Sequence, residues 1–148
     1  MENVNVIADS LNEKFGGRIG VSEDGKSLLV KAEEIIPVLT ELKENLTFSF
    51  LADLTAVDYP DNFTVVYHLM RLTDARIIRV KVILDKENPH IDSAVTLWHA
   101  ANVMERETFD LMGIIFDGHP DLKRILCPDD FEGHPLRKDF KVEAASRQ

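Results

Sequence analysis

The 148-residue chain has one cysteine, few glycines and prolines, and no long apolar run. A single cysteine excludes an internal disulfide and fits a reducing, cytoplasmic setting. No segment approaches the ~20 apolar residues that a membrane-spanning helix needs, and the N-terminus shows no signal-peptide pattern. The length and the 45% apolar content instead predict one globular domain with its own core.

The chain also lacks a basic surface. Its formal net charge is −9, and no lysine or arginine run alternates with aromatic residues. Because phosphate attraction dominates affinity for nucleic acid, this balance argues against nucleic-acid binding, and equally against direct adhesion to anionic lipid. The glycine-rich patterns of Rossmann and P-loop sites are absent, so no nucleotide site is predicted.

The first third of the chain shows the periodicity of two amphipathic helices separated by a short hairpin. Gly16-Gly17 ends the first helix, because glycine tolerates the left-handed conformation common just past a helix. Asp24-Gly25 is a strong turn signal for the hairpin. The expected elements are helices at residues 3–15 and 32–44, and strands at 18–22 and 27–31.

Three strand-like runs follow, at residues 48–57, 63–72 and 76–84. The last run alternates sharply, with Val80, Val82 and Leu84 facing a core and Arg79 and Lys81 facing water. Short turns between successive strands indicate antiparallel pairing. Together with the hairpin, these runs predict an α+β fold: a mostly antiparallel sheet of about four or five strands with helices packed on one face.

Regular structure is expected to become sparse toward the C-terminus. A short helix at residues 94–98, with Ser93 as its N-cap, and a helix at 101–109 are predicted. Beyond Gly113, glycine, proline and aspartate are frequent. We therefore expect an α+β part at 1–112 and, within the same domain, an extended C-terminal arm at 113–148. Ordered segments of this kind are usually functional.

The arm repeats a short phrase, Phe-Asp-Gly-His-Pro at residues 116–120 and Phe-Glu-Gly-His-Pro at 131–135. No zinc-binding spacing is present, and one cysteine cannot hold an iron–sulfur cluster. We therefore interpret each Gly-His-Pro as a bend whose imidazole bonds the backbone, rather than as part of a metal site. The potential metal ligands considered are His119, His134, Cys127, Glu107 and Asp110.

The helix before the arm carries three carboxylates, Glu105, Glu107 and Asp110. Glu107 and Asp110 are three residues apart and share a helix face, and crowded carboxylates can raise one pKa and create a general acid. We favour the alternative, an ion-pair network with Arg106, Arg124 and Arg137.

The arm also combines apolar anchors with charges of both signs, which suits a segment that wraps a neighbouring protein. Packing of the arm against its own sheet is the alternative, and the sequence leaves both open. The apolar anchors are Leu122, Ile125, Leu126, Leu136 and Phe140.

One block of residues resembles a known family. Glu105-Arg106-Glu107-x-x-Asp110-Leu-Met, followed by His119, Lys123 and Ile125-Leu126, is similar to the signature of the 30 kDa family, the C subunits of respiratory NADH:quinone oxidoreductase, complex I. Residues 133–140 resemble that family's C-terminal motif. The upstream stretches Leu51-x-Asp53-Leu-Thr-x-x-Asp58-Tyr-Pro60, residues 65–69 and residues 97–102 also resemble it.

The resemblance implies a non-catalytic subunit in the peripheral arm of a proton-translocating complex, at the cytoplasmic face of the membrane. Such a subunit binds no cofactor or metal itself, whereas NADH, FMN, iron–sulfur clusters and quinone belong to the complex. It packs against the D subunit, which is like a hydrogenase large subunit, beside the iron–sulfur subunits near the quinone-reducing end. The expected interface or arm-positioning residues are Glu105, Arg106, Glu107, Asp110, His119, Pro120, Arg124, His134, Pro135, Arg137, Lys138 and Asp139.

Two alternatives accompany this interpretation. The first is the corresponding subunit of a membrane-bound group 4 nickel–iron hydrogenase or of an F420H2 dehydrogenase complex. The second is a free-standing enzyme that uses Glu107, Asp110 and His119.

Overall fold

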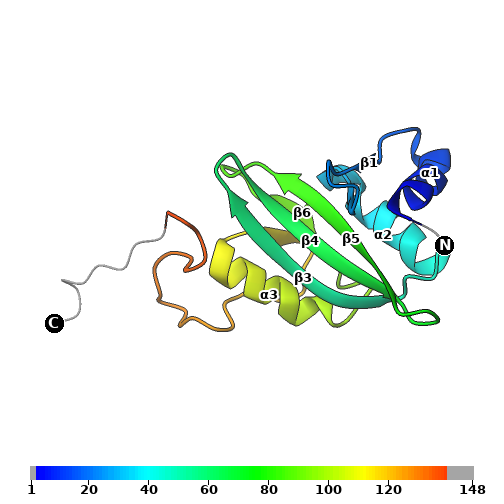
Figure 1. Ribbon diagram of the computed structural model, residues 1–148. Helices are drawn as coiled ribbons and strands as arrows, with labels where there is room; N and C mark the ends of the chain where they lie inside the picture. Colours follow the sequence, from blue (N-terminus) through cyan, green and yellow to red (C-terminus); the bar gives the residue numbers. More distant parts are fainter. Residues whose placement is uncertain (1–2, 140–148) are drawn as a thin grey trace.

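The computed structural model describes residues 3–139 (Figure 1). Within them lie a five-stranded mixed sheet, a separate two-stranded sheet and three α-helices, which confirms the predicted α+β fold. In chain order the elements are α1 (Val4–Phe15), β1 (Gly20–Val21), β2 (Ser27–Leu29), a 3-10 turn (Ala32–Glu34), α2 (Ile35–Glu44), β3 (Phe50–Tyr59), β4 (Asn62–Arg71), β5 (Arg76–Leu84), β6 (His90–Asp92), α3 (Ala101–Met112) and β7 (Ile115–Asp117).

The large sheet has the order β1-β2-β5-β4-β3. Strands β3, β4 and β5 form an antiparallel meander, and β1 pairs antiparallel with β2. The exception is β2, which runs parallel to β5, with Leu28 opposite Val80. The hairpin therefore joins the sheet beside a strand that comes much later in the chain, which short-turn reasoning could not foresee. This order leaves β3 at one edge.

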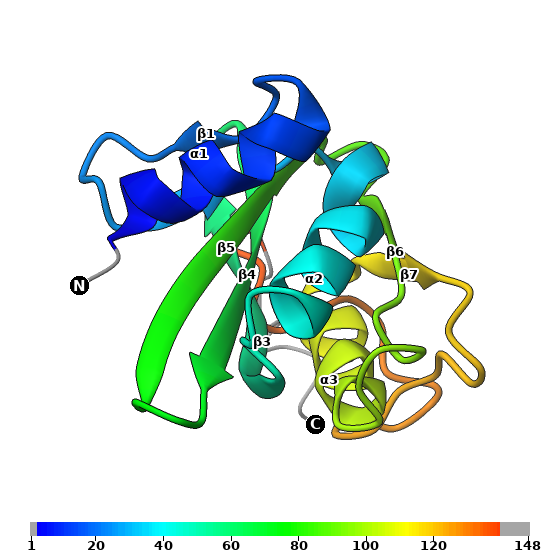
Figure 2. The ribbon, with the colours of Figure 1, turned by 90° about the vertical axis from the view of Figure 1, so that its right-hand side faces the viewer.

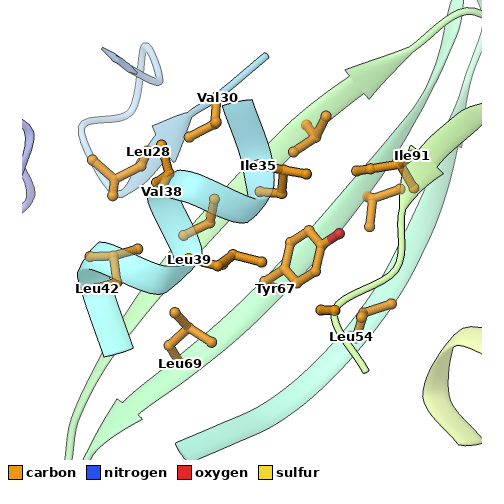
Figure 3. Close-up of a cluster of buried hydrophobic side chains, with 14 of the residues drawn as sticks. Leu28, Val30, Ile35, Val38, Leu39, Leu42, Leu54, Tyr67, Leu69 and Ile91 are labelled. Carbon is orange, nitrogen blue, oxygen red and sulfur yellow. The ribbon is translucent and has the colours of Figure 1, made fainter. Parts of the chain in front are cut away.

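Helices α2 and α3 lie on the same side of the meander (Figure 2). Helix α2 buries an apolar stripe there, and Tyr67 of β4 lies beneath it, beside Ile91 of β6 (Figure 3). Among the described residues, no helix covers the opposite face of β3, β4 and β5 (Figures 1 and 2). The helices therefore pack on one face of the meander, as predicted from the sequence.

Local signals set the ends of the first helix. The Asn3 side chain accepts a hydrogen bond from the Val6 amide at 3.0 Å and caps α1. Gly16 ends the helix with a φ of 62°. The end of the helix matches the expectation from the sequence, and its start lies one residue later than expected because Asn3 is the cap.

Strand β3 runs further than expected, to Tyr59, so that only Pro60 and Asp61 turn the chain into β4. Asp58 pairs with Phe63 inside the strand and is buried. Asp-Tyr-Pro is a typical turn sequence, but here Asp58 stays in the strand, where its side chain contacts Lys86 and the Lys138 amide.

Two expectations around the last helix were wrong. Residues 94–98 make a single turn rather than a helix, because five residues are too few to propagate a helix. The Ser93 hydroxyl still accepts the Val95 N–H at 3.2 Å, as an N-cap would, and donates to Glu105 at 2.6 Å. The short strands β6 and β7 were missed. They pair in parallel across 25 residues of sequence, with Ile91 opposite Phe116, and three-residue strands carry little periodicity.

The Tyr67 hydroxyl offers a test of this core. It is completely buried and has no hydrogen-bond partner among the described residues, and burial, followed by the Glu105 and Asp92 carboxylates, raises the pKa of Tyr67. Replacement Tyr67→Phe removes the orphaned hydroxyl and keeps the ring. We expect the free energy of unfolding to stay equal or to rise by about 1 kcal/mol in urea denaturation. A loss above about 1 kcal/mol would show that the hydroxyl is bonded.

Candidate functional site

Asp110 in the last turn of α3 is the centre around which the arm folds. Its Oδ2 accepts the backbone N–H groups of Ile125, Leu126 and Cys127 at 3.1, 2.6 and 2.8 Å. Its Oδ1 accepts a hydrogen bond from the Arg124 guanidinium at 2.7 Å. A fully buried carboxylate is thus satisfied entirely by the segment that follows it.

These contacts decide the charge state of Asp110. Burial acts to raise the pKa of its carboxyl, but the amides of Cys127 and Leu126, the Arg124 guanidinium and the Ile125 amide outweigh burial. Together they hold the pKa of Asp110 well below its usual range. Asp110 is therefore expected to be ionised at neutral pH, which suits an anchor for backbone N–H groups better than a general acid.

Two arginines extend this attachment. Arg124 donates to the Gly133 carbonyl at 2.8 Å, which closes the loop between residues 124 and 133. Arg106 on α3 donates to the carbonyls of Lys123 and Arg124, each at 3.1 Å. The expected ion-pair network is consequently reduced to one pair, Asp110–Arg124, while Arg106 bonds the backbone of the arm.

Both histidines of the repeated phrase bond backbone atoms. The Nδ1 of His119 accepts the Asp121 N–H at 2.9 Å, so its Nε2 carries the proton and donates to the Asn102 carbonyl at 3.0 Å. His134 places Nδ1 2.9 Å from the Asp110 carbonyl oxygen and therefore donates to it. Since both ring nitrogens of His119 are occupied, it has no lone pair left for a metal.

The end of the described arm runs back over α3 and the sheet. The Leu136 amide donates to the Leu111 carbonyl at 2.9 Å, and Arg137 donates through Nε to the Met112 carbonyl at 2.6 Å. The Arg137 guanidinium also lies 5.0 Å from the Phe63 ring centre, within the range of a cation–π contact. The arm thus packs on its own domain at these points.

Asp58 holds the last described turn. Its Oδ2 accepts the Lys138 backbone N–H at 2.8 Å, and Lys86 pairs with its Oδ1. Burial acts to raise the pKa of Asp58, but Lys86 and the Lys138 amide outweigh it and the net pKa is lowered. Sequence reasoning missed this role of Asp58. The available signal was a carboxylate at an inward-facing position of a strand.

Glu105 has a different task from Asp110. It is buried, and it accepts the Ser93 hydroxyl at 2.6 Å and the Ala94 amide at 2.7 Å. Burial raises the pKa of Glu105, and these two bonds offset part of the rise. Glu105 thus fixes the loop before α3 rather than the arm after it.

The remaining candidates do not join this cluster. Glu107 is exposed whereas Asp110 is buried, so α3 gives the two carboxylates different surroundings. Within residues 3–139, no three histidine, cysteine or acidic side chains gather as metal ligands would. Pro120 and Asp139 are exposed, Pro135 is half-buried, and Phe140 lies outside the described residues.

Asp58, Asp110 and the arm segment that they hold all lie within the residues that a protein-family model matches. The model of the family "Respiratory-chain NADH dehydrogenase, 30 Kd subunit" matches residues 28–146. The chain belongs to this family. It is 58% identical to the C subunit of NADH-quinone oxidoreductase from Moorella thermoacetica over 122 residues, which cover 81% of this chain and 82% of that protein.

Solved structures of similar proteins share the fold. A structure described as "Nqo5 of the trypsin-resistant fragment (1-134)" is 31% identical, with a TM-score of 0.67, and covers 78% of this chain and 98% of that one. A chain of the membrane-bound sulfane sulfur reductase, an archaeal respiratory membrane complex, is 26% identical with a TM-score of 0.79. The match covers 96% of this chain and 88% of that one. No helix among residues 3–139 is long and apolar enough to cross a bilayer.

Proposed function

We propose that this chain is a non-catalytic, peripheral-arm subunit of a proton-translocating NADH:quinone oxidoreductase. Its task is to dock the hydrogenase-like D subunit near the quinone-reducing end, beside the iron–sulfur subunits and on the cytoplasmic face of the membrane. NADH, FMN, iron–sulfur clusters and quinone are held by other subunits. The chain itself supplies a docking surface and no catalytic group.

The single observation that carries this proposal is the construction of the arm. The carboxylate of Asp110 is buried, and all of its described side-chain contacts go to residues 124–127. This arrangement supports a role of the family motif in fixing the surface of the arm. Leu126 and Leu136 are left 62% and 59% exposed on that surface. Apolar side chains on a rigid, hydrogen-bonded frame are typical of a protein–protein interface.

Co-purification from the native host tests the proposal. A tagged copy of the full chain, recovered from gently solubilised membranes, is expected to bring down a hydrogenase-like D subunit and iron–sulfur proteins that oxidise NADH with quinone. The tag expressed alone is the control. Recovery of a lone monomer would contradict the assembly role.

One alternative is the corresponding subunit of a group 4 nickel–iron hydrogenase or of an F420H2 dehydrogenase. The similarity to a chain of an archaeal sulfane sulfur reductase supports considering membrane-bound complexes other than the NADH:quinone oxidoreductase. The same purification separates the two. Flavin-containing and NADH-binding partners support the main proposal, whereas a nickel-containing partner or F420H2 oxidation supports the alternative.

A further inference from the structure

A slot runs between the edge strand β3 and helix α3, with a pocket of about 100 Å³ inside it. Four consecutive residues of β3, Asp53 to Ala56, form one wall, and Leu136 of the arm lies at the rim. The opposite wall is the part of α3 that carries Glu107 and Leu111. Asp110 and its partners at residues 124–127 do not line this slot.

The β3 wall is an open edge. Strand β3 ends the sheet order and pairs only with β4 among the described residues. A bulge lies between Leu51 and Asp53, so the regular part of the edge begins at Asp53. The arm reaches this edge at Asp58 and bonds its side chain rather than the backbone. Unpaired backbone groups of such an edge are a ready template for another strand.

The side chains of β3 at the slot are apolar on the face toward α3 and polar on the opposite, uncovered face. Leu54 and Ala56 face α3, where Leu111 and Leu136 add apolar surface. Asp53 and Thr55 alternate with them and point to the uncovered face of the sheet, where both are exposed. A strand added beside β3 would therefore have apolar side chains toward α3 and polar ones on the other face.

The acidic residues beside the slot favour basic side chains at the polar positions of an added strand. Asp53 and Glu107 are the charged residues of the two walls and both are acidic; Glu107 lies on α3, whereas the Asp53 side chain lies on the uncovered face of the sheet. Glu107 has no ion-pair partner among residues 3–139, and Asp53 has only His68, at 4.0 Å. Glu105, Arg106 and Asp110 of the same motif all bond within the chain, so Glu107 is the motif residue left for a contact outside it.

We propose that this slot binds an extended segment of a neighbouring protein in the complex, which adds a strand to the β3 edge. Its side chains alternate apolar residues toward α3 with lysine or arginine beside Asp53, and a second basic residue meets Glu107. This inference rests on the proposed function, because the segment belongs to a partner in the complex. A second copy of the chain does not fit, since two such edges would oppose acidic residues of the same sign.

Hydrogen–deuterium exchange of the full chain, alone and in the complex recovered through its tag, tests the slot. Amides of residues 53–57 are expected to exchange at least about tenfold more slowly in the complex. Recovery of the complex with unchanged exchange at 53–57 overturns the slot and leaves the assembly role intact. Recovery of no partner overturns both.

A charge-reversal pair tests the chemistry. Glu107→Lys should lower recovery of the partner about tenfold, because it opposes a basic side chain. Glu13→Lys is the matched control, since Glu13 is an exposed glutamate on α1, and it should recover the complex as the natural chain does. Equal melting temperatures of both variants show that they fold. Equal recovery of both variants, or a cross-linked pair of tagged chains from a photo-reactive residue at Thr55, overturns the proposal.

Discussion

Asp110→Asn is expected to lower the free energy of unfolding by about 3–5 kcal/mol, the usual cost of removing one partner from a buried ion pair. Asparagine has one acceptor oxygen where the carboxylate has two, so its NH2 group would face either the three backbone N–H groups or the Arg124 guanidinium, which are all donors. Arg124 would be left without its counter-charge. Urea denaturation followed by circular dichroism measures the loss.

The control for this substitution is Asp121→Asn in the same arm. Asp121 is exposed and its one ion pair within residues 3–139, with Lys123, spans 3.4 Å, so its loss is expected to change stability by less than about 0.5 kcal/mol. Limited proteolysis should cut the arm of the Asp110 variant faster than that of the Asp121 variant. Equal losses for the two variants would mean that Asp110 is not the anchor of the arm.

The lowered pKa of Asp110 also sets a pH dependence. A carboxyl whose pKa is lower in the folded chain contributes its full stability above its unfolded value, ~3.9, and loses it as the pH falls below that value toward the folded one. Acidification below about pH 4 should therefore weaken the natural chain more steeply than Asp110→Asn. Parallel stability curves of the two proteins below pH 4 would contradict this assignment.

Gly113→Ala is the second substitution with a large expected effect. Gly113 ends α3 with a φ of 80°, and a Cβ there would lie 2.8 Å from both the Arg137 guanidinium and the His134 ring. The substitution adds left-handed strain of about 1 kcal/mol and displaces the arm from the Asp110 and Met112 carbonyls. We expect a total loss of about 2–4 kcal/mol in urea denaturation.

Gly118→Ala separates strain from displacement. Gly118 has a φ of 83°, but nothing lies within 4 Å of a Cβ at that position. This variant should therefore lose only the strain, about 1 kcal/mol. The difference between the two variants measures how strongly the arm is seated against Gly113, and a difference near zero would show that the arm leaves it readily.

The elements with strong local signals were predictable. Helix α1 and the alternating strand β5 follow from periods of 3.6 and 2, and glycine signals mark the end of α1 and the hairpin at Asp24-Gly25. The missed elements depend on partners far along the chain. Strands β6 and β7 are three residues each and exist because they pair with one another, and β2 finds β5 across about 50 residues.

In the candidate site too, the residue types were predictable and the contacts with distant parts of the chain were not. The expected interface or arm-positioning residues include Asp110, Arg124, His119 and His134, and both imidazoles bond the backbone, as the interpretation of Gly-His-Pro expects. The sequence could not show that Asp110 gathers three successive amides. Backbone amides leave no trace in residue identity, and the burial of Asp58 required knowledge of which way β3 faces.

The bond between Asp58 and the Lys138 amide joins residues 80 positions apart, and this separation makes it a late contact in folding. Local contacts form before distant ones, because closing a longer loop costs more chain entropy. The meander can therefore be complete while the arm is still unattached, because during synthesis the arm leaves the ribosome after the meander. In that interval the β3 edge and the end of α3 are open together, so a partner protein can engage the nascent chain before the arm closes over it.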